Sequence, residues 1–540
     1  MLKHRIGVSL GVLSCVVLPC AAQAQGSVDA GSLQQQVERE RQTTLPPRAA
    51  PSPAAPVRGA PASAATLQVQ AFQFSGNQLL TSAALQDALQ GYLNRPLDFA
   101  QLQAAAASVA EAYRQAGWLA DAFVPAQNIQ DGVVRIQVVE AVFAGLTIEG
   151  QSARIDAQRL QRALAQQQAT GAPVHLPALD RALLLANDAP GVRVQEALRA
   201  GPRAGDTELV YRLSEQPLVS GSAKADNTGA RATGTARMST TLQLNSPYGV
   251  GDAWNANLVS SEGSRYARLA FSLPLGYDGW QLGANTSELG YRLRDADGQG
   301  TSQSNGVELR YPLVRARLHN LFLALSADHK TFDNQLAGSS ISQYTMDVQG
   351  LTLSANRFDD AWGGGANSLA LAWSSGRRTN QLGTSDAGFS KMRYAVSRQQ
   401  NLGAALSWYV ALEGQESDNT LDSSEGYYLG GANGVRAYPS DEARGSSGHL
   451  ARLELRWHCL TRWGLTAFYD HGRVRNSDGS PSYSLQGAGL ALQWQPGPAT
   501  SVAATVARRM GGNPNPTATG NDQDGSLSDN RFWLSANLAF

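Results

Sequence analysis

A cluster of glycines around one arginine and one tyrosine is the part of the sequence whose residue types point most clearly to a directed contact. Residues 430–439 read GGANGVRAYP and lie between two strand-like segments, in a region otherwise rich in Ser, Asp and Gly. The guanidinium of Arg436 presents a planar fork of donors that matches a carboxylate in geometry as well as charge. A solvated surface loop has no need of such a cluster. Arg436 is therefore the first candidate site residue, and the simpler alternative is a solvated arginine.

No pattern in the chain predicts catalysis or a bound cofactor. The sequence contains no nucleophile motif, phosphate-binding loop or cofactor fingerprint. His458 and His471 lack partners at the spacing of a metal site. Residues 511–530, GGNPNPTATGNDQDGSLSDN, carry oxygen ligands that suit calcium, but their irregular spacing favours a solvated outer loop. We therefore expect neither an enzyme nor a metal or cofactor site.

The N-terminus predicts export. Residues 1–24 form a basic tip, an apolar run and an A-x-A cleavage site, which is the pattern of a signal peptide. The apolar run is too short for a membrane anchor, and neither Cys15 nor Cys20 has the small-residue context of a lipoprotein. Cleavage leaves Cys459 as the one cysteine, so no internal disulfide is expected. Lys+Arg and Asp+Glu both number 44, a balance that gives no reason to expect nucleic acid as a partner.

The first part of the exported chain predicts a short helix on a tether. Residues 25–42 include the polar helical stretch VDAGSLQQQVERERQ, and residues 43–66 are dominated by Pro and Ala. Such a linker cannot pack and stays extended and semi-stiff. The alternative from composition alone is a disordered N-terminus.

Two small mixed domains are expected next. Residues 67–140 predict a strand, two helical segments broken at 94–96, and two further strands. Residues 141–216 repeat the same order of strand, two helices and two strands. We interpret this as an internal repeat of a small βααββ unit.

From residue 217 to residue 540 the pattern predicts strands alone. Segments of roughly 10–15 residues alternate with stretches of Gly, Asn, Asp and Ser, and about sixteen can be counted. Long polar connections are expected after the fifth, seventh, ninth, eleventh and fifteenth segments, and short ones after the fourth, tenth, twelfth and fourteenth. Short turns on one side and longer loops on the other are typical of a transmembrane β-barrel.

The alternation within the segments supports a membrane barrel with a polar interior. In residues 450–457, LARLELRW, Ala451, Leu453, Leu455 and Trp457 share one face while Arg452, Glu454 and Arg456 share the other. Residues 531–540, RFWLSANLAF, alternate in the same way and end on Phe540. An arginine on the lipid face would cost about 2–4 kcal/mol at the bilayer midplane, so the charged face is expected to line the lumen. Sixteen strands leave an aqueous lumen.

Two βααββ units followed by a sixteen-stranded barrel resemble the two-partner secretion transporters, the haemolysin and filamentous-haemagglutinin secretors of the barrel-assembly superfamily. FQFSGN at residues 72–77 and the stretch at 112–140 are similar to the family's first POTRA domain. The resemblance covers essentially the whole exported chain. It implies that the tethered helix lies inside the pore and closes it.

The resemblance also gives the arginine loop a context. The sixth outer loop, about residues 418–446, is where this family carries a V-R-G-[FY] motif on a loop folded into the lumen. Here Gly434 precedes Val435, Arg436, Ala437 and Tyr438, so alanine stands where the pattern has glycine. If that position required a backbone conformation reserved for glycine, alanine would be strained there.

The family's second motif, F-x-D-x-G on the thirteenth strand, matches Phe468, Asp470 and Gly472. Period-two geometry places these three residues on one face of the strand. The resemblance therefore implies that Asp470 points into the lumen and pairs with Arg436 to anchor the loop. The simpler alternative for Asp470 is a channel-lining carboxylate.

The expected function is an outer-membrane pore of a Gram-negative bacterium whose POTRA domains capture an exported, unfolded partner in the periplasm. The resemblance implies cargo of haemolysin or adhesin type with an N-terminal secretion domain, and insertion of the pore by the barrel-assembly machinery. A barrel-insertion factor is the main alternative, and a passive porin is a third.

Overall fold

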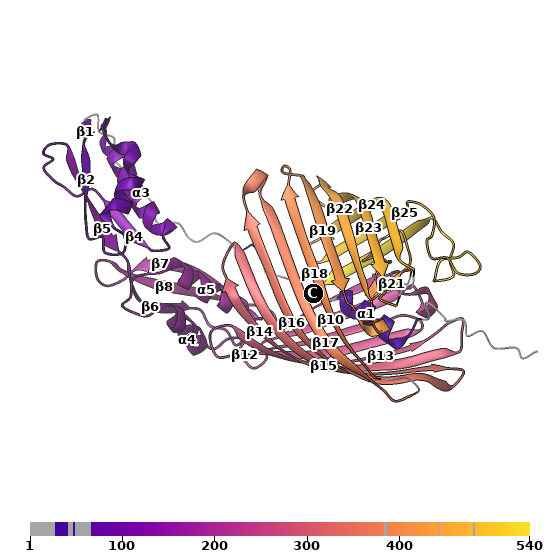
Figure 1. Cartoon of the computed structure of the whole chain (residues 1–540). Helices are drawn as coiled ribbons and strands as arrows, with labels where there is room; N and C mark the ends of the chain where they lie inside the picture. The colour runs from indigo at the N-terminus through magenta and orange to yellow at the C-terminus, as the bar shows by residue number, and fades with distance from the viewer. Residues whose placement is uncertain (1–27, 41–46, 49–65, 383–385, 441, 479–480) are drawn as a thin grey trace, which may run out of the picture.

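The computed structural model describes residues 28–40, 47–48, 66–382, 386–440, 442–478 and 481–540. The expected signal peptide lies outside the described residues, as does most of the expected linker. Two small domains precede a closed barrel, and a short helix lies within the barrel (Figure 1).

The first small domain packs two helices on a three-stranded sheet. The sheet order is β2-β5-β4, with β2 parallel to β5 and β4 antiparallel to it. A capping box between Asp98 and Gln101 starts the longer helix, and its apolar face packs on the sheet. The elements are β1 Leu67–Val69, β2 Ala71–Ser75, α2 Ser82–Ala88, η1 Gln90–Tyr92, β3 Arg95–Leu97, α3 Phe99–Gln115, β4 Ala120–Phe123 and β5 Val133–Glu140.

Strand β3 was not predicted, because the sequence pattern there gave only a helix break. Its three residues pair with β1 in a separate two-stranded sheet. Pro96 cannot donate a ladder hydrogen bond, which is tolerated at a sheet edge but weakens the strand signal in the sequence.

The second small domain repeats this connectivity. Its sheet order is β6-β8-β7, and its core gathers apolar residues from both helices and all three strands. The elements are β6 Val142–Glu149, α4 Ala157–Gln167, α5 Leu176–Asn187, β7 Val192–Ala200 and β8 Asp206–Glu215.

The predicted sixteen-stranded antiparallel barrel is confirmed. The last strand pairs with the first, so the sheet closes on itself and its backbone groups are paired around the ring. The strands are β9 Val219–Asp226, β10 Arg237–Asn245, β11 Ala253–Ser260, β12 Ser264–Leu275, β13 Trp280–Arg292, β14 Gly298–Arg315, β15 His319–Leu336, β16 Ser339–Asp359, β17 Gly365–Asn380, β18 Ala387–Asn401, β19 Leu406–Glu416, β22 Ser447–Leu460, β23 Trp463–Arg475, β24 Tyr483–Gly497, β25 Thr500–Arg509 and β26 Asn530–Ala539.

The prediction of a long polar loop after the seventh segment is wrong. Strands β15 and β16 continue to a two-residue turn of Ala337 and Gly338, whose φ angles of 49° and 74° suit a type I′ hairpin. Polar residues here stay paired in a β-ribbon past the apolar band, so their composition resembled that of a loop.

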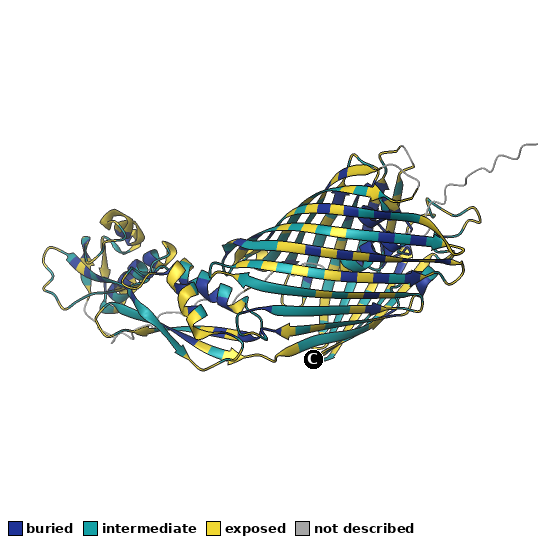
Figure 2. Ribbon diagram, turned by 90° about the horizontal axis from the view of Figure 1, so that it is seen from below, coloured by how far each residue is buried: buried dark blue, intermediate teal, exposed yellow. Residues whose placement is uncertain are grey.

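Burial alternates from residue to residue along many of the barrel strands (Figure 2), as expected where successive side chains face the lumen and the outer surface in turn. Leu453, Leu455 and Trp457 are 46–50% exposed on the outer face, while Arg452 and Glu454 are largely buried inside. The predicted orientation of this strand is therefore correct. Among the described residues, no helix has the length and apolar character needed to cross a membrane.

The barrel interior holds helix α1, Ala30–Glu40, and the loop between β19 and β22 (Figure 1). That loop contains the short helix η4 Ser423–Glu425 and the strands β20 Tyr427–Tyr428 and β21 Arg444–Gly445, which pair with each other. Two further short helices, η2 Arg231–Thr233 and η3 Ala361–Gly363, lie in connections between barrel strands.

Candidate functional site

The connection between β19 and β22, which we call the inward loop (residues 417–446), fills part of the lumen. Most of its described residues from 421 onward are buried, although the loop connects two neighbouring barrel strands and could have extended into solvent. Six of its apolar residues form one cluster with lumen-facing residues of the wall, including Leu450, Phe468 and Leu485. The loop is thus packed like a core, unlike a solvated surface loop.

The structure brings Arg436 and Asp470 together. Arg436 Nε lies 2.8 Å from Asp470 Oδ2 and Nη2 lies 2.7 Å from Oδ1, so the contact is a bidentate fork. The backbone N–H of Arg436 also donates to Asp470 Oδ2, at 3.1 Å. Asp470 is fully buried, and its carboxylate depends on these donors for compensation.

Three further wall residues contact Arg436. The guanidinium carbon lies 3.5 Å from the centre of the Phe468 ring, a cation–π contact. Arg436 Nη2 lies 2.9 Å from Glu454 Oε1, and the indole N–H of Trp533 donates to the Arg436 carbonyl at 2.8 Å. Glu454 could have been found from its inward face in the LARLELRW strand. Trp533 could not, because it lies almost a hundred residues away on the last strand.

Glycines let the loop approach itself and the wall. A Cβ on Gly434 would meet the Leu429 carbonyl oxygen at 2.0 Å, and a Cβ on Gly472 of the wall would meet the Leu429 side chain at 2.2 Å. Gly431 alone among the described glycines of this loop has a positive φ, 95°. Close packing, more than backbone freedom, explains this glycine cluster.

The alanine at 437 is not strained. Ala437 is fully buried and is absent from the described non-glycine residues with positive φ. Its Cβ faces Gly487 of β24, where an added Cβ would lie 2.5 Å away. The missing methyl of Gly487 therefore provides the space for Ala437. Val435 and Tyr438 are also buried, and the Tyr438 ring lies 5.0 Å from the guanidinium carbon of Arg509.

The last long connection, residues 510–529, pairs with Arg509 of the wall, whose guanidinium contacts Tyr438 of this motif. Asp522 is fully buried and pairs with Arg509 at 2.6 Å and with Arg531 at 2.8 Å. Asp524 also pairs with Arg531. These carboxylates are matched by arginines, which argues against the calcium alternative. Within the described ranges, no group of three His, Cys, Asp or Glu side chains is placed to hold a metal ion.

Glu442 of the inward loop meets the same connection. It is fully buried, accepts a hydrogen bond from the Gln523 backbone N–H at 2.9 Å, and contacts the Asn513 amide. Burial, with Asp522 and Asp524 nearby, raises the pKa of Glu442 to about 7.

Helix α1 lies across the lumen against the inward loop and the wall. Its first turn donates from the Ala30 N–H to Asn334 Oδ1 at 2.9 Å. Near its end, Arg39 pairs with Glu413 at 2.5 Å, and Glu40 pairs with Arg237 at 3.0 Å. These contacts reach opposite strands of the barrel and fix the helix in the lumen.

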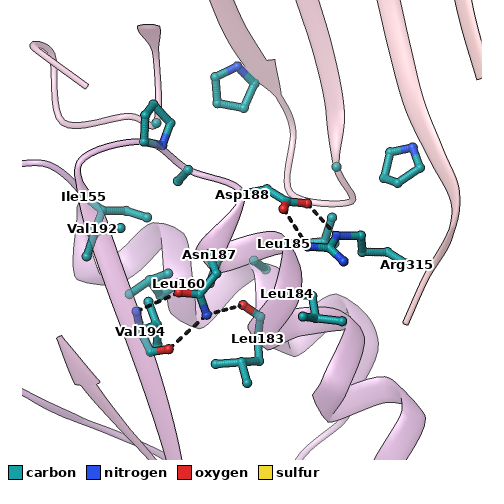
Figure 3. A pocket seen from close by; sticks show the side chains of 18 of the residues that line it. Ile155, Leu160, Leu183, Leu184, Leu185, Asn187, Asp188, Val192, Val194 and Arg315 are labelled. Atoms are coloured by element: carbon teal, nitrogen blue, oxygen red, sulfur yellow. Dashed lines mark hydrogen bonds and ion pairs between the residues drawn. The ribbon is translucent and has the colours of Figure 1, made fainter. Parts of the chain in front are cut away.

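A cavity of about 1030 Å³ separates the second small domain from the near end of the barrel (Figure 3). Leu184, Leu185 and Asp188 line it on the domain side, and Arg310 and Arg315 line it on the barrel side. Asp188 and Arg315 form a bidentate pair with distances of 2.8 and 2.9 Å. The domain is therefore docked on the barrel by directed ion pairs beside this cavity.

Comparisons with known proteins agree with this architecture. A sequence model of the family described as haemolysin secretion/activation protein ShlB/FhaC/HecB matches residues 205–494, and one of the ShlB-type POTRA domain matches residues 67–141. The chain is 25% identical to the heme/hemopexin transporter protein HuxB of Haemophilus influenzae, over 98% of this chain and 97% of HuxB. It is 25% identical to the outer membrane transporter CdiB of Dickeya dadantii, over 74% of this chain and 75% of that protein. The solved structure of CdiB from Escherichia coli superposes with a TM-score of 0.69 at 21% identity, covering 94% of this chain and 97% of CdiB.

Proposed function

Since the chain belongs to the haemolysin secretion/activation family ShlB/FhaC/HecB, we propose that it takes up one unfolded exported protein in the periplasm and releases it at the cell surface. The chain is an outer-membrane transporter of two-partner secretion, with its POTRA domains in the periplasm.

Capture occurs on the POTRA domains by strand addition. In the two sheets the outer strands β4 and β7 each have one neighbour, β5 and β8 respectively. An extended segment can add to such an edge through main-chain hydrogen bonds, which suits an unfolded partner. The partner carries an N-terminal secretion domain that supplies this segment.

The inward loop and helix α1 together close the resting pore. Arg436, in the motif with Gly434, Val435, Ala437 and Tyr438, anchors the loop to the wall motif of Phe468, Asp470 and Gly472. The observation that carries the proposal is this bidentate anchor, made inside a closed barrel that follows the POTRA domains. Opening for transport displaces helix α1, while the anchor keeps the loop positioned.

The partner's folding outside the cell provides direction to transport. A segment that has folded at the surface cannot return through the lumen. The cargo is a haemolysin- or adhesin-type exported protein, and the barrel itself reaches the membrane through the barrel-assembly machinery.

Reconstitution tests the proposal. The purified protein is inserted into liposomes, the unfolded partner is added to the POTRA side, and its transfer is measured by protection from added protease. Protection that requires the POTRA domains is expected. If the partner stays protease-sensitive while the liposomes promote insertion of other barrels, the protein is a barrel-insertion factor and the proposal fails.

A further inference from the structure

The inward loop is held to a second part of the wall by a carboxylate that no motif marks. Glu425, in the short helix η4, is 3% exposed. Its Oε1 lies 2.8 Å from the ammonium of Lys330 on β15, and its other oxygen contacts Lys391 on β18. Lys391 also donates to the Glu425 backbone carbonyl at 3.1 Å. Two wall lysines thus converge on one loop carboxylate.

This contact lies on a different wall from the arginine anchor. Arg436 binds strands β22 and β23, whereas Glu425 binds β15 and β18. Asp422, the cap of η4, extends the same attachment: it accepts from the Tyr344 hydroxyl at 2.8 Å and pairs with Arg378 at 3.2 Å. The loop is therefore fixed at two separate places and crosses the lumen between them.

Helix α1 rests directly on this second attachment. A Cβ on Gly31 would lie 2.5 Å from the Ser423 hydroxyl and 2.9 Å from the Ser424 backbone nitrogen, so helix and η4 are in close contact. The Gln35 side chain donates to the Gly426 carbonyl at 3.1 Å. If η4 left the wall, the helix would lose the surface it packs against.

We infer that Glu425, held by Lys330 and Lys391, is a positioning residue that keeps η4 where helix α1 packs against it. Glu425 thereby determines how stably helix α1 closes the resting pore. Its carboxylate is compensated only while η4 lies against the wall, because both lysines belong to wall strands. The inference extends the proposed role of α1 in closing the pore, but it concerns the resting protein without cargo.

A cysteine-protection assay tests this role in the full chain. Cys459 is replaced by alanine and Gln34→Cys places a thiol on the buried face of α1, where Gln34 is 3% exposed. The purified protein is labelled with a large maleimide, and planar-bilayer conductance is recorded in parallel. Glu425→Gln keeps the shape of the side chain but leaves the ammonium groups of Lys330 and Lys391 without their carboxylate partner. This variant is expected to raise the labelling rate about tenfold or more and to increase the open time of the pore.

The matched control is Glu416→Gln, which removes an exposed rim carboxylate paired with Arg475. Labelling at the starting rate is expected there. Replacing Glu425, Lys330 and Lys391 together with glutamine removes the charges of all three residues. This triple variant is expected to bring the labelling rate part of the way back to that of the starting protein. A merely steric role would give no such recovery.

Equal labelling of the Glu425→Gln variant and the starting protein overturns the inference, as does equal acceleration in the Glu416→Gln control. If Glu425→Gln prevents barrel insertion, judged by heat-modifiable migration, the Lys330→Gln variant is measured instead. An unchanged labelling rate in that variant then overturns the inference. Because no partner protein is present, failure here leaves the secretion proposal standing.

Discussion

Replacing Arg436 with alanine removes the fork to Asp470, the pair with Glu454 and the cation–π contact with Phe468. Asp470 is fully buried and would keep only the backbone N–H of residue 436 as a compensating donor from the loop. Breaking a buried pair on one side costs about 3–5 kcal/mol. The cost here is near the lower end, about 3 kcal/mol, because that donor and the Arg456 partner of Glu454 remain. This shifts the equilibrium between the anchored loop and the released loop roughly a hundredfold toward release.

The assay measures partner protein at the cell surface together with the amount of inserted barrel. Arg436→Ala is expected to abolish or sharply reduce surface delivery while the barrel remains heat-modifiable, since its strands do not depend on the loop. Arg436→Lys keeps the charge without the fork and should give an intermediate loss. Arg475→Ala, at an exposed rim pair, is the control and should secrete normally. Normal secretion by an inserted Arg436→Ala barrel would refute the anchoring role.

Gly487→Ala should impair secretion because its Cβ would meet Ala437, and adding Ala437→Gly should restore it; unrestored secretion in the double variant would show that the clash is not the cause. Glu442 is protonated in the packed loop below pH about 7, whereas an unfolded glutamate titrates near 4.3, so its contribution to stability is complete below about pH 4.3 and is lost as pH rises through about 7. In detergent, Tm should therefore fall as pH rises through about 7, and Glu442→Gln should remove the part of this fall that Glu442 causes. An unchanged dependence of Tm on pH in the variant would contradict the raised pKa of Glu442. Asp188→Asn should loosen the second POTRA domain, giving roughly tenfold faster hydrogen exchange at the junction with Arg315 while the barrel exchanges as before; equal exchange would mean that other contacts carry the docking.

The strands were predictable because they depend on short-range alternation, whereas the central pair was predicted from the resemblance to the family's two motifs. Period-two alternation placed Arg452 and Glu454 on the lumen face, and it placed Asp470 on one face of its strand with Phe468 and Gly472. The resemblance then implied that this face lines the lumen and that Asp470 pairs with Arg436. The hairpin at Ala337 was missed because polar residues in an extended ribbon outside the bilayer have the composition of a loop.

The remaining site contacts depend on how the barrel closes. Glu425 lies 95 residues from Lys330 and 34 from Lys391, and their meeting requires the loop to turn inward across the lumen. Trp533 reaches Arg436 only because the last strand closes the ring. No local periodicity carries such information, so these residues had no signal in the sequence.

Surface delivery of the exported partner, measured in cells that lack this protein, tests the central claim most directly. Deleting the gene should remove the partner from the surface while other outer-membrane barrels stay at normal levels, and the wild-type chain should restore delivery. Intact delivery of the partner together with falling barrel levels would contradict the account.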